Sequence, residues 1–250
     1  MRTRVLSVLV IVMITAGVAS AQSVIITPKK VVYRRTAKSV PDWKRTFEVR
    51  YPIFSGKVGP AVLRNLKTST DYWRIFDMKF ADNLRDEHWL SNFDYQVKYN
   101  KHNILEIWLY IEGIGAYPDG STKYVVLDTR TGNRLAIRDL FLASRMPDLL
   151  GRIRGVMKRS EEEASTESEE VREALQQHYE SFPELHPTAE KIEFKDLTGF
   201  AISDTGVTFM FDYGYAHVIQ ALEPSGEFFL SYAELKPFIR TDGLLARFAR

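Results

Sequence analysis

Much of the chain alternates between hydrophobic and polar residues with a period of two, which is typical of strands that bury one face. Short turns rich in glycine, aspartate and asparagine separate neighbouring runs, as at 128–133 and 203–206. Such turns join antiparallel strands into hairpins because their residues accept positive φ. The predicted strands span residues 43–51, 91–99, 104–111, 124–127, 135–137, 197–202, 207–213 and 227–230.

Two segments show the period of an amphipathic helix instead. Between 60 and 87, apolar residues recur at spacings of three and four, and Pro60 suits a first helical turn. A second such segment begins near Pro147. The aromatic face of the first segment is expected to pack on a sheet rather than to line a ligand site. The patterns predict an α+β fold, with antiparallel sheets of hairpins packed by amphipathic helices in a single compact domain.

The N-terminus has the pattern of a secretory signal peptide. Arg2 and Arg4 precede an apolar run, and small residues suit cleavage before Gln22. A membrane-spanning anchor is the weaker alternative, because a spanning helix needs about 20 apolar residues. We therefore expect an exported protein, periplasmic or extracellular. The predicted divisions are a signal peptide at 1–21, an N-terminal extension at 22–42, one domain at 43–240 and a C-terminal tail at 241–250.

Composition narrows the classes of function. The 250 residues include no cysteine, which excludes disulfides and thiol chemistry. Removal of Arg2 and Arg4 would leave 32 basic against 32 acidic residues, so the mature chain lacks the bulk charge that attracts nucleic acid. A local excess of basic residues at 29–50 is expected to be the solvated face of a strand.

Catalytic motifs are not evident. None of the five histidines lies in a helix-spaced zinc pair or near a nucleophile motif, so we predict no metal, no cofactor and no catalytic residue. The glutamates crowded at 161–170 are expected to form a solvated segment. Two carboxylate pairs suit the chemistry of glycoside hydrolysis, which leaves a cell-wall glycan hydrolase as the alternative. These pairs are Glu106 with Glu112 and Asp119 with Asp128.

A glycine-rich segment at 112–121 supplies the main binding candidate. It contains three glycines and a Pro-Asp-Gly sequence, and we expect a loop at the rim of the sheet. Tyr117 and Asp119 are expected to be exposed there and to contact a ligand. A second set of residues is also a candidate for ligand binding, and the alternative for it is packing within a sheet. This set contains Tyr213, Tyr215 and His217.

Several strings together resemble one family. LDTRTGNRLAIRDLF at 127–141 resembles a family pattern of an aspartate, a Thr-Gly turn and a closing Asp-Leu-Phe, and GIGAYP at 113–118 is similar to its Gly-Gly-Ala-His loop. ISDTGVTFMFDYGYA at 202–216 and SYAEL at 231–235 resemble its final hairpin and closing helix. In this order the strings resemble the extracytoplasmic domain shared by RsiV-type anti-sigma factors and PdaC-type peptidoglycan deacetylases.

The resemblance implies an α+β domain that binds a component of the cell envelope, which in RsiV-type proteins is lysozyme. Tyr117 stands where that family commonly has histidine. We expect neither the sigma-binding segment and membrane span of RsiV-type proteins nor the deacetylase domain of PdaC-type proteins. The prediction is a non-catalytic binding protein whose candidate partners are lysozyme, another envelope protein or peptidoglycan. Nucleic acid is not an expected partner, and no membrane span is expected after signal cleavage.

Overall fold

The first half of the chain forms a six-stranded sheet in which spatial order follows sequence order. Neighbouring strands are antiparallel as predicted, except that β2 and β3 pair in parallel over two residues. A parallel pair requires a crossover, and three short helices provide it. The strands are β1 (Val24–Arg34), β2 (Thr46–Gly56), β3 (Leu90–Lys101), β4 (Ile104–Ile114), β5 (Pro118–Asp128) and β6 (Asn133–Arg134).

The computed structural model describes residues 24–85, 89–165, 169, 173, 176–177, 180–181, 189–215 and 223–249. The predicted signal peptide therefore lies outside the described residues. Part of the predicted N-terminal extension is β1, which pairs along its whole length with β2. The predicted C-terminal tail contains the short helix η6 (Ala246–Phe248) and the fully buried Leu245. Both terminal segments thus contribute to the folded body.

The crossover between β2 and β3 contains α1 (Pro60–Ser69), α2 (Tyr72–Ile75) and α3 (Phe80–Arg85). The sequence predicts one or two helices here, and the local caps explain why there are three. Asp71 Oδ1 accepts a hydrogen bond from Trp73 N at 3.1 Å, which starts α2. Asp77 has φ of 52° between α2 and α3, outside the helical region. The apolar faces of these helices cover one face of the sheet, as expected.

Strand β4 separates two hydrophobic cores. Leu105, Ile107 and Leu109 face the first core, together with residues of α1 and α2. Ile104 belongs to the second core, which the C-terminal part of the chain builds on the other face. Because side chains alternate along a strand, β4 serves both cores at once. This explains why its sequence is a nearly continuous apolar run.

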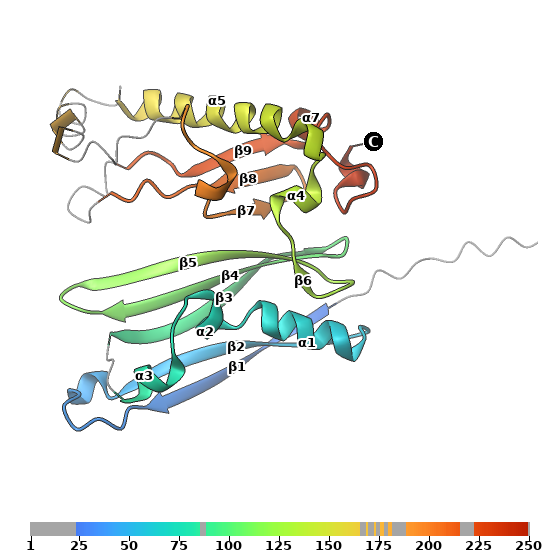
Figure 1. Cartoon of the computed structure of the whole chain (residues 1–250). Coiled ribbons are helices and arrows are strands. Elements are labelled where there is room, and N and C mark those ends of the chain that lie inside the picture. The colour runs from blue at the N-terminus through green and yellow to red at the C-terminus, as the bar shows by residue number, and fades with distance from the viewer. Residues whose placement is uncertain are drawn as a thin grey trace, which may run out of the picture.

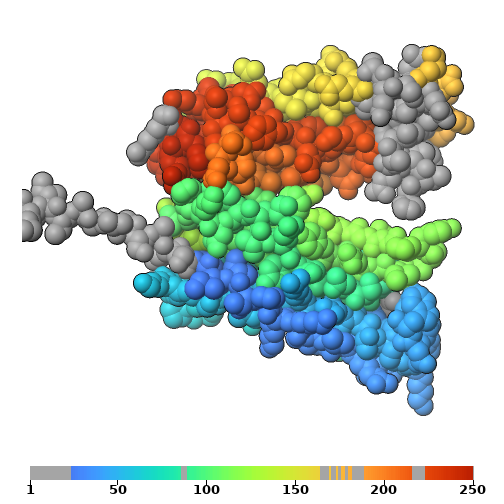
Figure 2. Space-filling view, turned by 180° about the vertical axis from the view of Figure 1, so that it is seen from behind, coloured from blue at the N-terminus to red at the C-terminus, as the bar shows by residue number. Residues whose placement is uncertain are grey.

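The C-terminal part forms a second layer that lies on β4 and β5 (Figures 1 and 2). Its three-stranded antiparallel sheet has the order β7, β8, β9, and the long helix α5 covers it (Figure 1). The hairpin of β7 and β8, the strand β9 and the start of α5 agree with the predictions. The elements are α4 (Ile137–Leu140), η2 (Ala143–Arg145), α5 (Met146–Ser165), η4 (Phe194–Asp196), β7 (Gly199–Ile202), β8 (Gly206–Met210), β9 (Glu227–Ser231) and α7 (Tyr232–Leu235).

Local hydrogen bonds determine where the short helices α4 and α7 begin. Residues 135–137 were predicted as a strand, but β6 ends at Arg134 because Asp139 Oδ2 accepts from Ala136 N at 2.7 Å and starts α4. At α7 the predicted capping box forms: Ser231 Oγ accepts from Glu234 N, and the Glu234 carboxylate accepts from Ser231 N. Among the described residues, no helix combines the length and the apolar character needed to cross a membrane.

Candidate functional site

The predicted rim loop is a three-residue tip between two long strands. Ile114 pairs with Pro118, so only residues 115–117 lie outside the ladder, and the expectation of a loop over 112–121 is wrong. Proline is tolerated at the first residue of a strand, where no ladder N–H is required of it. At Gly120 an added Cβ would lie 2.8 Å from the carbonyl oxygen of Ile111, so glycine permits this close approach of the strands. The Pro-Asp-Gly sequence therefore begins β5 instead of forming a turn.

The two residues predicted at this rim are both exposed. Tyr117 lies at the tip with 72% of its surface accessible, and its carbonyl oxygen accepts from Gly115 N at 3.1 Å. Asp119 is exposed on β5, and its Oδ1 accepts from Gly120 N at 2.7 Å. The tip thus carries an accessible aromatic ring on a backbone that paired strands hold in place.

A second exposed aromatic residue belongs to the short helix η1 (Asp42–Lys44). Trp43 is 66% exposed, although its alternating pattern predicted a place on the buried face of a strand. The strand β2 begins only at Thr46, so Trp43 precedes the ladder. Lys44 connects η1 to the hairpin tip: its Nζ donates to the carbonyl oxygen of Ile114 and lies 4.7 Å from the centre of the Trp43 ring.

Trp89 completes this end of the sheet. Its carbonyl oxygen accepts from Ile114 N at 2.8 Å, and its half-buried indole lies against two glycines of β4 and the tip. An added Cβ would lie 2.3 Å from the indole at Gly113 and 3.4 Å from it at Gly115. Glycines that suggested a flexible loop therefore make room for the indole. We call Trp43, Lys44, Trp89 and Tyr117 the hairpin-end surface.

The second set of predicted site residues does not join this surface. Tyr213 and Tyr215 are only 4% and 6% exposed and belong to the core of the C-terminal layer. The rings of Phe211 and Tyr213 meet edge to face at 4.9 Å, and Tyr213 N donates to Glu223 at 3.0 Å. These two tyrosines therefore pack within the layer, which was the alternative to ligand binding. His217 lies outside the described residues.

The two carboxylate pairs considered for glycoside hydrolysis are too far apart. Glu106 and Glu112 are six positions apart along β4, a distance of roughly 20 Å along a strand. Asp119 and Asp128 are nine positions apart along β5, a distance of roughly 30 Å. The reaction needs carboxyl groups roughly 5 to 10 Å apart. Neither pair can act together on one glycosidic bond.

Glu106 instead connects the two layers. Its side chain is 1% exposed, its Oε1 accepts from the indole of Trp108 at 2.6 Å, and its Oε2 accepts from Ile202 N on β7 at 2.5 Å. Burial raises the pKa of Glu106, while these two donors and Lys98 oppose the shift. This acid is buried by the second layer, which nothing in its local sequence signals.

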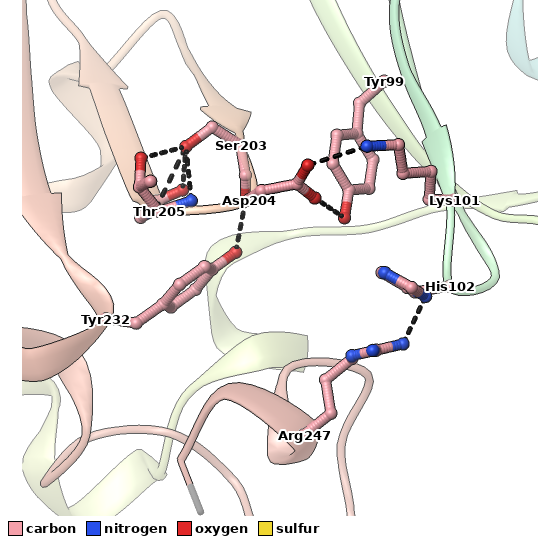
Figure 3. Close-up of polar contacts among 9 residues, drawn as sticks. Tyr99, Lys101, His102, Ser203, Asp204, Thr205, Tyr232 and Arg247 are labelled. Atoms are coloured by element: carbon pink, nitrogen blue, oxygen red, sulfur yellow. Dashed lines mark hydrogen bonds and ion pairs between the residues drawn. The ribbon is translucent and has the colours of Figure 1, made fainter.

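A polar cluster joins the layers at the β3–β4 turn. Figure 3 shows the carboxylate of Asp204 pointing toward Tyr99 and Lys101 of that hairpin. Asp204 accepts from the hydroxyl of Tyr99 at 3.0 Å and from Lys101 Nζ at 2.7 Å. Nearby, Arg247 of η6 donates to His102 Nδ1, and the hydroxyl of Tyr232 donates to the carbonyl oxygen of Ser203 at 2.9 Å. We call this cluster the interlayer joint.

The interlayer joint brings together serine, histidine and aspartate without connecting them as a nucleophilic triad requires. Ser203 Oγ accepts from the backbone of its own turn at Thr205 and Gly206, while His102 contacts Arg247. Burial and Arg247 lower the pKa of His102. Within the described ranges, no three His, Asp or Glu side chains are placed to hold a metal ion. The hydrogen bonds of the joint hold turns together.

Comparison with known proteins identifies the fold. No protein-family model matches the sequence, and no curated protein matches it either. Among solved structures, a DUF3298 family protein from Bacteroides fragilis superposes with a TM-score of 0.53 at 12% identity, covering 91% of this chain and 97% of its own. The chain has the DUF3298 fold.

A second DUF3298 family protein, from Pseudomonas aeruginosa, gives a TM-score of 0.50 at 13% identity and covers 88% of this chain and 94% of its own. Identities this low establish a shared fold and nothing about function. DUF3298 denotes a domain of unknown function. The resemblance to RsiV-type and PdaC-type domains stays a prediction that agrees with the α+β architecture.

Proposed function

We propose that the protein is a non-catalytic binding protein of the cell envelope and that the hairpin-end surface contacts its partner. The observation that carries the proposal is the pair of widely exposed aromatic residues Trp43 and Tyr117. Lys44 lies over the Trp43 ring and donates to the carbonyl oxygen of Ile114, where β4 ends before the tip that carries Tyr117. The resemblance to RsiV-type domains supports lysozyme, another envelope protein or peptidoglycan as the partner.

The physical argument rests on preorganisation. The rings of tryptophan and tyrosine bury large apolar areas, and their polar atoms donate hydrogen bonds to a protein or a sugar. β4 and β5 pair over eleven residue positions up to the tip, and Trp89 packs against Gly113 of β4 and Gly115 of the tip. Little conformational entropy is then lost when a partner immobilises the surface.

Export is part of the same proposal. It is supported by the signal-peptide pattern at 1–21. An exported chain without cysteine gains no disulfide outside the cytoplasm, so its stability rests on the two cores. Fractionation of cells producing the full chain tests it, with mature protein that starts at Gln22 expected outside the cytoplasm. Full-length protein retained in the cytoplasm would contradict export without affecting a binding result.

Binding is tested with the purified mature protein against lysozyme and against peptidoglycan. Tyr117→Ala and Trp43→Ala should each weaken saturable binding by about tenfold or more, as truncation of an anchoring aromatic residue does. Phe229→Ala is the matched control, because Phe229 is an aromatic residue on β9 that is 46% exposed. It should bind as the parent protein does.

Two results would contradict the proposal. Binding that survives both substitutions would remove the hairpin-end surface from the interface. Release of soluble sugar from peptidoglycan, lost on substitution of a carboxylate, would support the glycan hydrolase instead. Retained folding of each variant is checked by circular dichroism, so that a loss of binding is not a loss of structure.

A further inference from the structure

A cavity of about 460 Å³ lies where the two layers meet, away from the hairpin-end surface. Its walls come from β5 and β6, from α4 and the start of α5, and from η4 and β7. Figure 1 shows α4 and β7 on the side of the upper layer that faces β5 and β6. The volume falls within the range of small-molecule sites. The cavity therefore has room for an organic ligand of modest size.

One part of the wall is apolar and aromatic. Gly199 of β7 lies directly on Tyr124 of β5, since an added Cβ would be 2.9 Å from the Tyr124 Cβ. Trp108 of β4 also packs against Tyr124, and the two rings meet edge to face with their centroids 5.0 Å apart. A flat apolar group fits such a surface because aromatic rings stack or meet edge to face. The further apolar lining residues are Val126, Leu135, Ile137, Met146, Phe194 and Phe200.

Among the described residues that line the cavity, every charged side chain is basic. These are Arg134, Arg138 and Lys195. Lys195 forms an ion pair with Glu193 at 2.8 Å, whereas Arg134 and Arg138 form none with the described residues. Two guanidinium groups thus remain to meet an anion, which they recognise through their fork of N–H donors.

The environment of Arg134 strengthens this reading. The side chain is accessible to solvent, yet burial lowers its pKa and the nearby Arg74 lowers it further. A cation on the wall of a recess experiences this combination, and a bound anion would oppose both effects by stabilising the charged guanidinium. Neighbouring acids have other roles: Asp139 caps the start of α4, and Asp196 accepts from Glu193 N at 2.7 Å.

We infer that this cavity binds a small organic anion with a flat apolar body, such as an aromatic carboxylate or sulfonate. Arg134 and Arg138 hold the anionic group, and the face formed by Tyr124, Phe194 and Phe200 covers the apolar body. The site is independent of the proposed envelope partner because none of its lining residues belongs to the hairpin-end surface.

Two fluorescent probes that differ in charge test the inference. Anilinonaphthalene sulfonate has the anion and the flat body, and N-phenylnaphthylamine is its uncharged counterpart. The folded mature protein should bind the sulfonate with one saturable site and at least about tenfold more tightly than the amine. The R134Q/R138Q double variant should lose that preference, with about a tenfold weaker sulfonate affinity.

The control variant is Arg64→Gln, an exposed arginine on α1 that does not line the cavity. It should bind both probes as the parent does. Ala136→Phe, which places a ring in the cavity, should remove both signals. Equal affinity for the two probes, or sulfonate binding unchanged in R134Q/R138Q, would overturn the inference. Thermal melting of each variant shows that the probes report the native state.

Discussion

Replacing a buried hydrogen-bonding residue costs more stability than replacing an exposed one, because its partners are left without a hydrogen bond. Glu106 is buried and accepts from Trp108 and from Ile202 N. Glu106→Ala leaves both donors without an acceptor, so we expect the free energy of unfolding to fall by about 2–4 kcal/mol. Denaturant unfolding followed by circular dichroism measures this loss. Glu112→Ala, on an exposed position of the same strand, is expected to change stability by less than about 0.5 kcal/mol.

Glu106 should also make the folding stability of the protein depend on pH in a defined direction. Because the folded-state pKa of Glu106 is raised, its contribution is fully present below the unfolded-state pKa and is lost as the pH rises through the folded-state pKa. The stability of the parent relative to Glu106→Gln should therefore decrease as the pH rises from the acid side towards neutrality. Denaturation midpoints of both proteins across that range measure the difference.

Asp204 provides the opposite case in the same experiment. Lys101 and Tyr99 lower its pKa, so its contribution is present at neutral pH and is lost as the pH falls through the folded-state pKa. The parent should lose stability relative to Asp204→Asn on acidification. If the stability of the parent relative to Glu106→Gln and relative to Asp204→Asn changed in the same direction with pH, the opposite pKa shifts of the two residues would be contradicted.

Among the elements, the β3–β4 turn has the most demanding backbone. His102 and Asn103 have φ of 58° and 64°, as a two-residue hairpin turn of this hand requires. A β-branched residue is strained in that region, so Asn103→Val should destabilise the protein by about 1–2 kcal/mol, whereas Asn103→Gly should not. Urea unfolding of both variants tests this, and equal losses would contradict a backbone origin.

Elements with a strong local signal were predictable from the sequence. Alternation located β3 and β8, and a nearly continuous apolar run located β4. Pro60 located the start of α1, and the capping box at Ser231 located the start of α7. The loop predicted at 112–121 was wrong because glycine signals flexibility and close packing alike. Only the position of the Trp89 indole, brought there by the chain before β3, shows that packing is the reason at Gly113.

The candidate site was predictable in part for a related physical reason. The exposure of Tyr117 follows from its place in a hairpin tip, which its sequence neighbourhood suggests. Tyr213 and Tyr215 also stand beside a glycine, but the second core buries them. Arg134 and Arg138 become neighbours of Phe200 only when the layers meet. Contacts between layers have no signature in a local window of sequence.

At the scale of the whole molecule, the six-stranded sheet and the C-terminal layer can be monitored separately during unfolding. All four tryptophans, at positions 43, 73, 89 and 108, lie in the part of the chain that forms the six-stranded sheet. Tryptophan fluorescence therefore reports that sheet, and amide exchange at β8 reports the C-terminal layer. If the contacts across Gly199 make one cooperative unit, the two signals of the parent should change at the same denaturant concentration.

Gly199→Val should separate those signals. The added side chain cannot fit beside Tyr124, so β7 must move away from β5 at a cost of about 1–3 kcal/mol. The first core lies on the opposite face of β4 and keeps its contacts. Protection at β8 should then be lost at a lower denaturant concentration than the fluorescence change. Gly151→Ala on α5, where an added Cβ meets nothing within 4 Å, is the control that should leave the signals together. Signals that still coincide in Gly199→Val would mean that the layers are coupled elsewhere, with the interlayer joint around Asp204 as the remaining connection to test.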